Sequence, residues 1–168
     1  MQVRRALPGD AAAIADVHVR TWQAAYGHVF EPERLARIDV SRRAAGWSRR
    51  LADGETAFVA ERDGAVVAFA SVGPARDLHG LGELYAIYAL PAAWGSDAGP
   101  ALMRASVGAL RAAGYGEAVL WVLEDNPRAR RFYEREGWTL DGAAKEDEFL
   151  GTRVPEVRYR ISLAGPGS

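Results

Sequence analysis

The sequence predicts an α/β fold with a mixed, mostly antiparallel central sheet of about seven strands and helices on both faces. Apolar runs of strand length alternate along the chain with segments that have helical periodicity. Two of the runs flank Asp63-Gly64, a dipeptide typical of a tight β-hairpin. A third run, residues 82–90, is apolar almost throughout, as expected of a central strand that is covered on both faces.

The first third of the chain predicts one strand followed by helices. Residues 3–7 form a short strand, and Asp10 is placed to cap the helix that follows. Apolar and aromatic residues then recur at helical spacing: Ile14, Val17, His18, Thr21, Trp22 and Ala25. Pro32 is placed to open a second helix, and a third runs from Ser41 to its end at Gly54.

The remaining elements alternate between helix and strand. We expect a helix over about 98–113, a buried strand over 117–123 and a compact helix between Pro127 and Gly137. Strands at 138–142 and 156–163 complete the sheet. Taken together, these elements predict one domain over residues 1–163, and residues 164–168 form a flexible C-terminal tail.

Composition excludes several classes of function. The chain has 168 residues, a formal net charge of −1 and 49% hydrophobic residues, which gives no basic surface for nucleic acid or a membrane. No apolar stretch reaches the length of a membrane span. Cysteine is absent, which excludes thiolate metal sites and a cysteine nucleophile and fits a cytoplasmic location. The three histidines have no metal-site spacing, so we expect no metal.

The segment YALPAAWGSDAGPALM, residues 88–103, leads from a strand through a short loop into a helix. The unpaired N–H groups at such a helix start, together with the helix dipole, form a site for an anion. Every strand–helix junction exposes some N–H groups of this type, so the loop alone is only weak evidence for a phosphate site.

The motifs downstream of this loop make the signal stronger. Asn126 leads into a helix that carries Phe132-Tyr133, and Gly137-Trp138 follows it. This order of motifs resembles the GNAT superfamily of N-acetyltransferases, in particular a bacterial single-domain branch. The resemblance covers essentially the whole chain and is strongest over residues 83–138. It implies that an acetyl group passes directly from the co-substrate acetyl-CoA to a primary amine of a small molecule or peptide.

The pyrophosphate loop is degenerate by comparison with this family. Members carry Arg/Gln-x-x-Gly-x-Gly/Ala, and here Trp94, Asp97 and Gly99 stand at the three motif positions. Asp97 adds a side chain and a charge where glycine lets a phosphate approach. Two like unit charges 4 Å apart repel by roughly 1 kcal/mol in water and about 4 kcal/mol at an effective dielectric of 20. We therefore expect weakened coenzyme A affinity. Alternatively, Ser96 or Asp97 caps the helix and takes the amides that a phosphate would use.

The resemblance implies a coenzyme A site made of a strand end, the loop and parts of the later helix. Backbone groups of residues 87–90 would pair with the pantetheine amides. Arg130 belongs to an arginine cluster that is either a solvated helix face or a contact for the 3′-phosphate. The implied set is Ile87, Tyr88, Ala89, Leu90, Trp94, Gly95, Ser96, Asp97, Ala98, Gly99, Pro100, Asn126, Arg130 and Tyr133.

Three residues are candidates for the chemistry. By resemblance, Tyr133 would be the general acid near the sulfur, and the alternative is a core aromatic beside Phe132. Asn126 would hydrogen-bond the pantetheine arm or an ordered water. Glu83 is the candidate base, with a solvated strand end or a base acting through water as alternatives. Trp121 stands where the ribosomal-protein acetylating branch carries a glutamate, so that role does not transfer.

The acceptor site and the acceptor are less defined. Trp22, Tyr26 and Tyr88 are the substrate-binding candidates, although the spacing of the first two equally fits a helix core. A peptide N-terminus, a polyamine, an aminoglycoside or an amino-acid analogue all fit as acceptors, and relatives are commonly dimers, so a homodimer is considered. The alternative function is a non-catalytic binding or regulatory protein of the same fold, which Asp97 favours.

Overall fold

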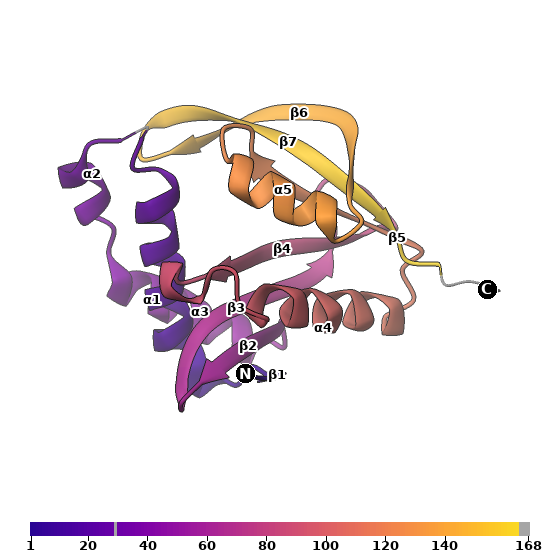
Figure 1. The fold of residues 1–168 in the computed structure, drawn as a ribbon, viewed down its shortest axis with the longest axis horizontal. Helices are drawn as coiled ribbons and strands as arrows, with labels where there is room; N and C mark the ends of the chain where they lie inside the picture. The colour runs from indigo at the N-terminus through magenta and orange to yellow at the C-terminus, as the bar shows by residue number, and fades with distance from the viewer. Residues whose placement is uncertain (29, 165–168) are drawn as a thin grey trace. The chain divides into compact units, whose positions relative to one another are not determined.

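The computed structural model describes residues 1–28 and 30–164. The chain folds into two compact units: the first comprises Met1–Val72 and Ala86–Ser106, and the second Gly73–Tyr85 and Val107–Ser168. Seven strands follow the order β1-β2-β3-β4-β5-β7-β6, and helices connect them (Figure 1). The predicted α/β class with a mixed, seven-stranded sheet is confirmed. The single domain over residues 1–163 stays a prediction, and residues 165–168 of the predicted tail lie outside the described residues.

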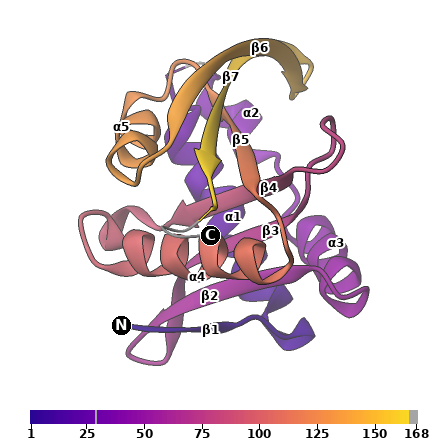
Figure 2. The ribbon, with the colours of Figure 1, turned by 90° about the vertical axis from the view of Figure 1, so that its right-hand side faces the viewer.

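Three antiparallel strands form the sheet of the first unit. They are β1 (Gln2–Arg5), β2 (Thr56–Arg62) and β3 (Ala65–Pro74), which lie side by side in Figure 2. The turn between β2 and β3 places Asp63 at φ 53° and Gly64 at φ 81°. Positive φ at both central residues matches the twist of the flanking strands, so the predicted hairpin is confirmed.

The helices of the first unit are α1 (Ala11–Ala25), α2 (Pro32–Ala36) and α3 (Val40–Ala52). All three were expected from the sequence, and α3 begins one residue before the predicted start. The Asp39 carboxylate accepts a hydrogen bond from the Arg42 amide at 3.1 Å and so caps α3. Among the described residues, no helix is long and apolar enough to cross a membrane.

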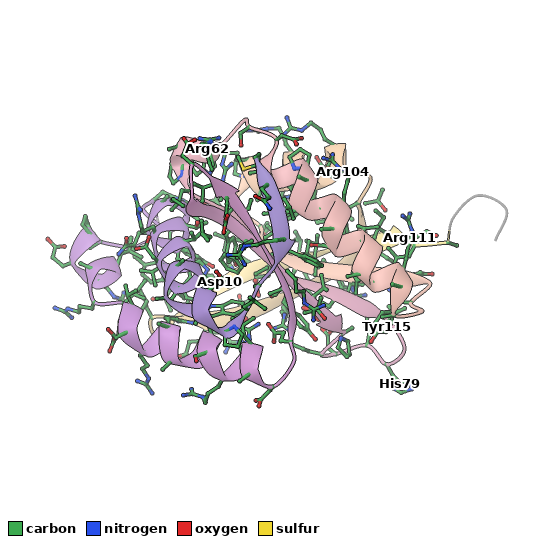
Figure 3. All side chains as sticks on the ribbon, turned by 90° about the horizontal axis from the view of Figure 1, so that it is seen from below. Asp10, Arg62, His79, Arg104, Arg111 and Tyr115 are labelled. Atoms are coloured by element: carbon green, nitrogen blue, oxygen red, sulfur yellow. The ribbon has the colours of Figure 1, made fainter. Side chains whose placement is uncertain are left out.

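Asp10 stands at the first boundary of α1, but it does not cap the helix with its side chain (Figure 3). Its carboxylate accepts from the Leu7 amide and from both terminal nitrogens of Arg4, each at 2.8 Å. Asp10 is therefore the N-cap residue by position, as predicted, but its side chain does not form the capping hydrogen bond. The physical reason is competition: a guanidinium from β1 offers two charge-assisted bonds, which are stronger than one bond to a helix amide.

An aromatic cluster in the first unit surrounds His18, which is 8% exposed. Its Nδ1 accepts a hydrogen bond from Trp47 Nε1 at 3.2 Å, which joins α1 to α3. The ring centroid lies 4.4 Å from that of Trp22, 5.8 Å from Phe69 and 5.2 Å from Tyr88. Burial lowers the pKa of His18 to about 3, and the nearby positive charges of two arginines act in the same direction. The imidazole is therefore neutral at physiological pH.

The rest of the chain contributes two helices and four strands. They are β4 (Gly82–Ala89), α4 (Ala98–Ala112), β5 (Glu117–Leu123), α5 (Pro127–Arg135), β6 (Thr139–Phe149) and β7 (Thr152–Ser162), and a short 3₁₀ turn at Pro91–Ala93 precedes α4. Strand β5 pairs with β7, and β7 with β6, in antiparallel fashion. The parallel ladder between β4 and β5 joins Gly82 to Ala118 and Glu83 to Val119.

Strands β6 and β7 form a long hairpin, drawn from orange to yellow in Figure 1. Each was predicted as a shorter strand, over 138–142 and 156–163. The extra length includes the charged residues 145–148, whose intrinsic strand propensity is low. Their partners on β7 impose the extended conformation, and the hairpin turns at Leu150 (φ 51°) and Gly151 (φ 79°).

Gly82 gives a direct test of packing in the second unit. A Cβ on Gly82 would lie 2.7 Å from Leu110 Cδ2 and 3.1 Å from the ring of Tyr115, whereas a Cβ on Gly108 would meet nothing within 4 Å. We expect Gly82→Ala to lower the free energy of unfolding by about 1–3 kcal/mol through overpacking. The control Gly108→Ala, in the exposed interior of α4, should raise it by about 0.5–1 kcal/mol. Urea denaturation measures both, and equal effects would contradict the packing.

The lowered pKa of the buried His18 should make the stability of the fold depend on pH. In the unfolded chain the imidazole is protonated below about pH 6.5, whereas in the folded chain it stays neutral down to about pH 3. The unfolded state therefore binds the extra proton in this window, and stability falls as the pH falls.

When the pH is lowered from 7 to 5, we expect this histidine to lower the free energy of unfolding by about 2 kcal/mol. His18→Asn keeps an acceptor for the Trp47 indole but does not titrate. Its denaturation midpoint should depend less on pH over this range than that of the native chain, and identical dependences would show that His18 is not the group responsible.

Candidate active site

The loop before α4 leaves backbone amides available for an anion. Ser96 Oγ accepts from the Ala98 amide at 3.2 Å, so Ser96 provides the side-chain cap. Gly95 has φ 77° and turns the chain into the helix. Among the residues that the structure describes, the amides of Asp97 and Gly99 donate to no acceptor. These two N–H groups are the kind of donors that bind phosphate at a helix start, and binding of a diphosphate by this loop stays a prediction.

Asp97 does not take the place of the phosphate as a helix cap. Its carboxylate lies 3.6 Å from the guanidinium of Arg104, which Figure 3 labels on α4. Both side chains are about two-thirds exposed, at 66% and 68%. A pair this exposed contributes little stability. Arg104 nevertheless places a positive charge beside Asp97, which offsets part of the repulsion of an incoming phosphate.

Trp94, at the first motif position, is 40% exposed and donates from Nε1 to the Ala89 carbonyl at 2.9 Å. The Leu90 amide donates to the Val67 carbonyl at 2.9 Å, and the Leu90 carbonyl accepts from Ala93 at 2.8 Å. The end of β4 is therefore largely satisfied within the first unit. A pantetheine arm on this strand has to use other backbone groups, nearer Ile87 and Tyr88, or displace the Trp94 indole.

Two of the predicted acceptor residues lie in contact in the first unit. Trp22 Nε1 donates to the Tyr88 hydroxyl at 3.4 Å, and both side chains are half-buried. Tyr26, at the C-terminal end of α1, has its ring centroid 6.4 Å from that of Trp22 and 5.9 Å from that of Phe30. The structure thus brings these aromatic side chains together at the edge of the core.

Two residues of this cluster, His18 and Arg43, were not predicted as site residues. The Arg43 guanidinium lies 4.4 Å from the centroid of the Trp22 ring, and its side chain is half-buried. Burial lowers the pKa of Arg43, and the Tyr88 hydroxyl acts in the opposite direction. A signal existed in the sequence, because Arg43 and Trp47 are four residues apart and so share one face of α3.

In the second unit, Tyr133 is 6% exposed on α5. Its ring centroid lies 5.7 Å from that of Phe132 and 6.1 Å from that of Tyr159. This burial is compatible with a core aromatic and with an acid shielded from water. The Oδ1 of Asn126 accepts from the Ala129 amide at 3.2 Å and caps α5, which leaves its NH₂ group for another acceptor.

Arg130 is tied into a local network. Its Nε donates to the Tyr159 hydroxyl at 3.1 Å, and Nη1 donates to the Glu124 carbonyl at 3.0 Å. The Tyr159 hydroxyl in turn donates to Glu134 Oε2 at 2.8 Å. The hydrogen bond that Arg130 donates to Tyr159 is the main cause that raises the pKa of Arg130. These bonds give Arg130 a structural role, and its contact with a 3′-phosphate stays a prediction.

Glu83, the candidate base, is fully buried at 0% exposure. Its Oε1 accepts from the Arg76 amide at 3.1 Å, and its Oε2 accepts from Arg76 Nε at 3.1 Å and from Nη2. Glu83 is also the main cause that raises the pKa of Arg76. The carboxylate thereby anchors the segment between β3 and β4. A role as base stays a prediction, and it requires this ion pair to open.

The predicted residues divide between the units. The first unit holds the aromatic candidates and the pyrophosphate loop, and the second holds Glu83, Asn126, Arg130 and Tyr133. Within the described ranges, no cluster of three histidine, aspartate or glutamate side chains is arranged to bind a metal ion.

Comparison with known proteins identifies the family. A model of the acetyltransferase (GNAT) family matches residues 12–138. The chain is 34% identical over 159 residues to the uncharacterized N-acetyltransferase YuaI of Bacillus subtilis, covering 92% of this chain and 89% of that protein. It is 33% identical over 139 residues to the uncharacterized N-acetyltransferase Rv2669 of Mycobacterium tuberculosis, covering 79% and 85%.

A solved structure has the same fold. The structure of yncA from Salmonella typhimurium, a putative acetyltransferase with its cofactor acetyl-CoA, matches with a TM-score of 0.74 and 22% identity. The match covers 100% of this chain and 96% of that one. With the family model matching most of its length, the chain belongs to the GNAT family of acetyltransferases.

Proposed function

We propose that this protein transfers an acetyl group directly from acetyl-CoA to a primary amine. The observation that carries the proposal is the pair of unused amides, Asp97 and Gly99, at the start of α4 in a chain of this family. They suit the pyrophosphate of coenzyme A. In the reaction, the neutral amine nitrogen bonds to the thioester carbonyl carbon and the C–S bond breaks. The nitrogen then loses a proton and the sulfur gains one.

Tyr133 is proposed as the donor of the proton to the leaving thiolate. A buried hydroxyl suits this role because a site without water strengthens its hydrogen bond to the developing negative charge. The NH₂ group of Asn126 is proposed to hydrogen-bond the pantetheine arm or a water, since its Oδ1 is engaged in the cap of α5. Deprotonation of the amine is assigned to Glu83 or, with Glu83 retained by Arg76, to water.

The open edge of β4 supports a place for the pantetheine arm. Within the described chain, the ladder from β4 to β5 joins Gly82 to Ala118 and Glu83 to Val119, and it ends at Glu83. Backbone groups on this edge can pair with the amides of an added, strand-like ligand. For the protein as a whole we propose a cytoplasmic location and a homodimer.

The alternative is a non-catalytic protein of the same fold. Asp97 is the observation that favours it, because it places a negative charge in the loop that we propose for the diphosphate. Binding of acetyl-CoA distinguishes the two functions, and isothermal titration calorimetry at low and moderate salt measures it. Micromolar binding supports the transferase, and no binding up to millimolar ligand would leave only the non-catalytic function.

Asp97 is expected to weaken coenzyme A binding chiefly through its charge. Asp97→Asn should tighten acetyl-CoA binding by about 10-fold at low salt and by less at higher salt. Asp97→Gly should tighten it further, because the backbone can then approach the phosphates. Asp53→Asn removes an exposed carboxylate at the end of α3 and serves as the control. Calorimetric dissociation constants that are unchanged in both Asp97 variants would contradict this account.

Tyr133 is expected to act on the chemical step. Tyr133→Phe should lower kcat by about 10²–10⁴-fold, the usual contribution of a general acid, while acetyl-CoA affinity stays within a factor of two to three. Thiol release during acetylation of a panel of primary amines gives the rates. Tyr115→Phe, a half-buried tyrosine of the same unit, is the control. A Tyr133→Phe variant with native kcat would assign this residue to the core instead.

A further inference from the structure

Two arginines on α3 lie over tryptophan rings, and they differ in one respect. The Arg50 guanidinium is 3.8 Å from the centroid of the Trp47 ring, and its Nε donates to Glu55 Oε1 at 2.9 Å. The Arg43 guanidinium is 4.4 Å from the centroid of Trp22. Throughout the part of the chain that the structure describes, Arg43 has no carboxylate partner. Arg50 thus forms an ion pair with Glu55. Arg43 is a half-buried cation that forms no ion pair with a carboxylate of the described residues.

The neighbours of Arg43 do not neutralise it. The groups whose charges act on it are the Tyr88 hydroxyl and the guanidinium of Arg42. His18 is neutral because it is buried, and with Nδ1 accepting from Trp47 it carries its proton on Nε2. Among the described residues, the surroundings of Arg43 are therefore aromatic and offer no carboxylate partner, and they are partly shielded from water. An arginine in such surroundings gains most from an anionic ligand.

The position of this cation matches the predicted acceptor region. Trp22 is its ring partner, and Tyr88 is hydrogen-bonded to Trp22 at 3.4 Å. Both aromatic side chains are half-buried, so a small molecule can reach their exposed edges. The planar guanidinium over the indole carries a fork of N–H donors, which is the geometry that binds a carboxylate through two parallel bonds.

We propose that the amine acceptor carries a carboxylate, as an amino acid does, and that Arg43 binds it against Trp22 and Tyr88. This inference rests on the proposed function and names the class of acceptor for it. Among the acceptors that the sequence left open, it favours amino acids and their analogues over polyamines and aminoglycosides, whose positive charges Arg43 would repel.

The test compares matched amines with and without the carboxylate. The pairs are phenylalanine with phenethylamine, leucine with isopentylamine and methionine with 3-(methylthio)propylamine, extended to the remaining common amino acids. The full-length protein should acetylate at least one amino acid with a kcat/KM well above that of its decarboxylated amine. Turnover only of amines without a carboxylate overturns the inference and leaves the proposed function intact.

Variants of Arg43 show whether this residue makes the distinction. Arg43→Met should lower kcat/KM for the preferred amino acid by on the order of 10- to 100-fold, mainly through KM, and leave the decarboxylated amine unaffected. Arg43→Lys keeps the positive charge but lacks the fork of donors, so its kcat/KM for the preferred amino acid should lie between those of the native chain and Arg43→Met. Arg49→Met, an exposed arginine on the same helix, is the control and should change neither rate.

The outcomes separate the two proposals. An equal loss for both members of a pair in Arg43→Met overturns the role of Arg43 in recognition, since a purely structural residue affects both amines alike. No turnover of any amine, together with no binding of acetyl-CoA, removes the proposed function and this inference with it. Thermal unfolding of each variant shows whether its fold is retained.

Discussion

The neutral imidazole of His18 is the contact on which the first unit depends. It packs against aromatic side chains from α1, α3, β3 and β4, and its Nδ1 accepts the indole hydrogen of Trp47. Because the ring is uncharged, it can be buried without a carboxylate beside it. The same contacts hold Trp22 and Tyr88 at the border of the core. The surface that we propose for recognition of the acceptor thus consists of residues that also stabilise the unit, with the Arg43 guanidinium beside them.

The amides that the loop before α4 offers to an anion depend more on its backbone conformation than on the residue types of the family motif. Ser96 binds one amide, Gly95 turns the chain, and the amides of Asp97 and Gly99 remain unused within the described residues. A comparison by residue type counts Asp97 as a lost glycine. The geometry adds that its carboxylate is directed toward Arg104 on the outside of the helix. We therefore expect the charge of Asp97 to weaken anion binding at this loop without occupying its two amides.

The sequence predicted those elements whose signals are local. Asp63-Gly64 specified the β2–β3 hairpin, and the spacing along residues 14–25 specified α1, because a turn and a helix face are decided by near neighbours. The length of β6 was underestimated because its charged residues are extended only by pairing with β7. The pairing of Asp10 with Arg4 and the place of Arg43 over Trp22 were missed for the same reason. Whether a charge is paired depends on residues from other elements, such as Arg4 for Asp10.

Glu83 shows how burial decides between two roles for one carboxylate. A residue at the start of a central strand is well placed to enter a cleft, which made it the candidate base. Full burial, however, demands a partner, and Arg76 supplies its guanidinium and its backbone amide. Removing a proton from an amine with this group would disturb that ion pair, and breaking a buried ion pair is costly. The buried pair is thus better suited to fix the segment between β3 and β4, and His18, with a pKa of about 3, is too weak a base to replace it.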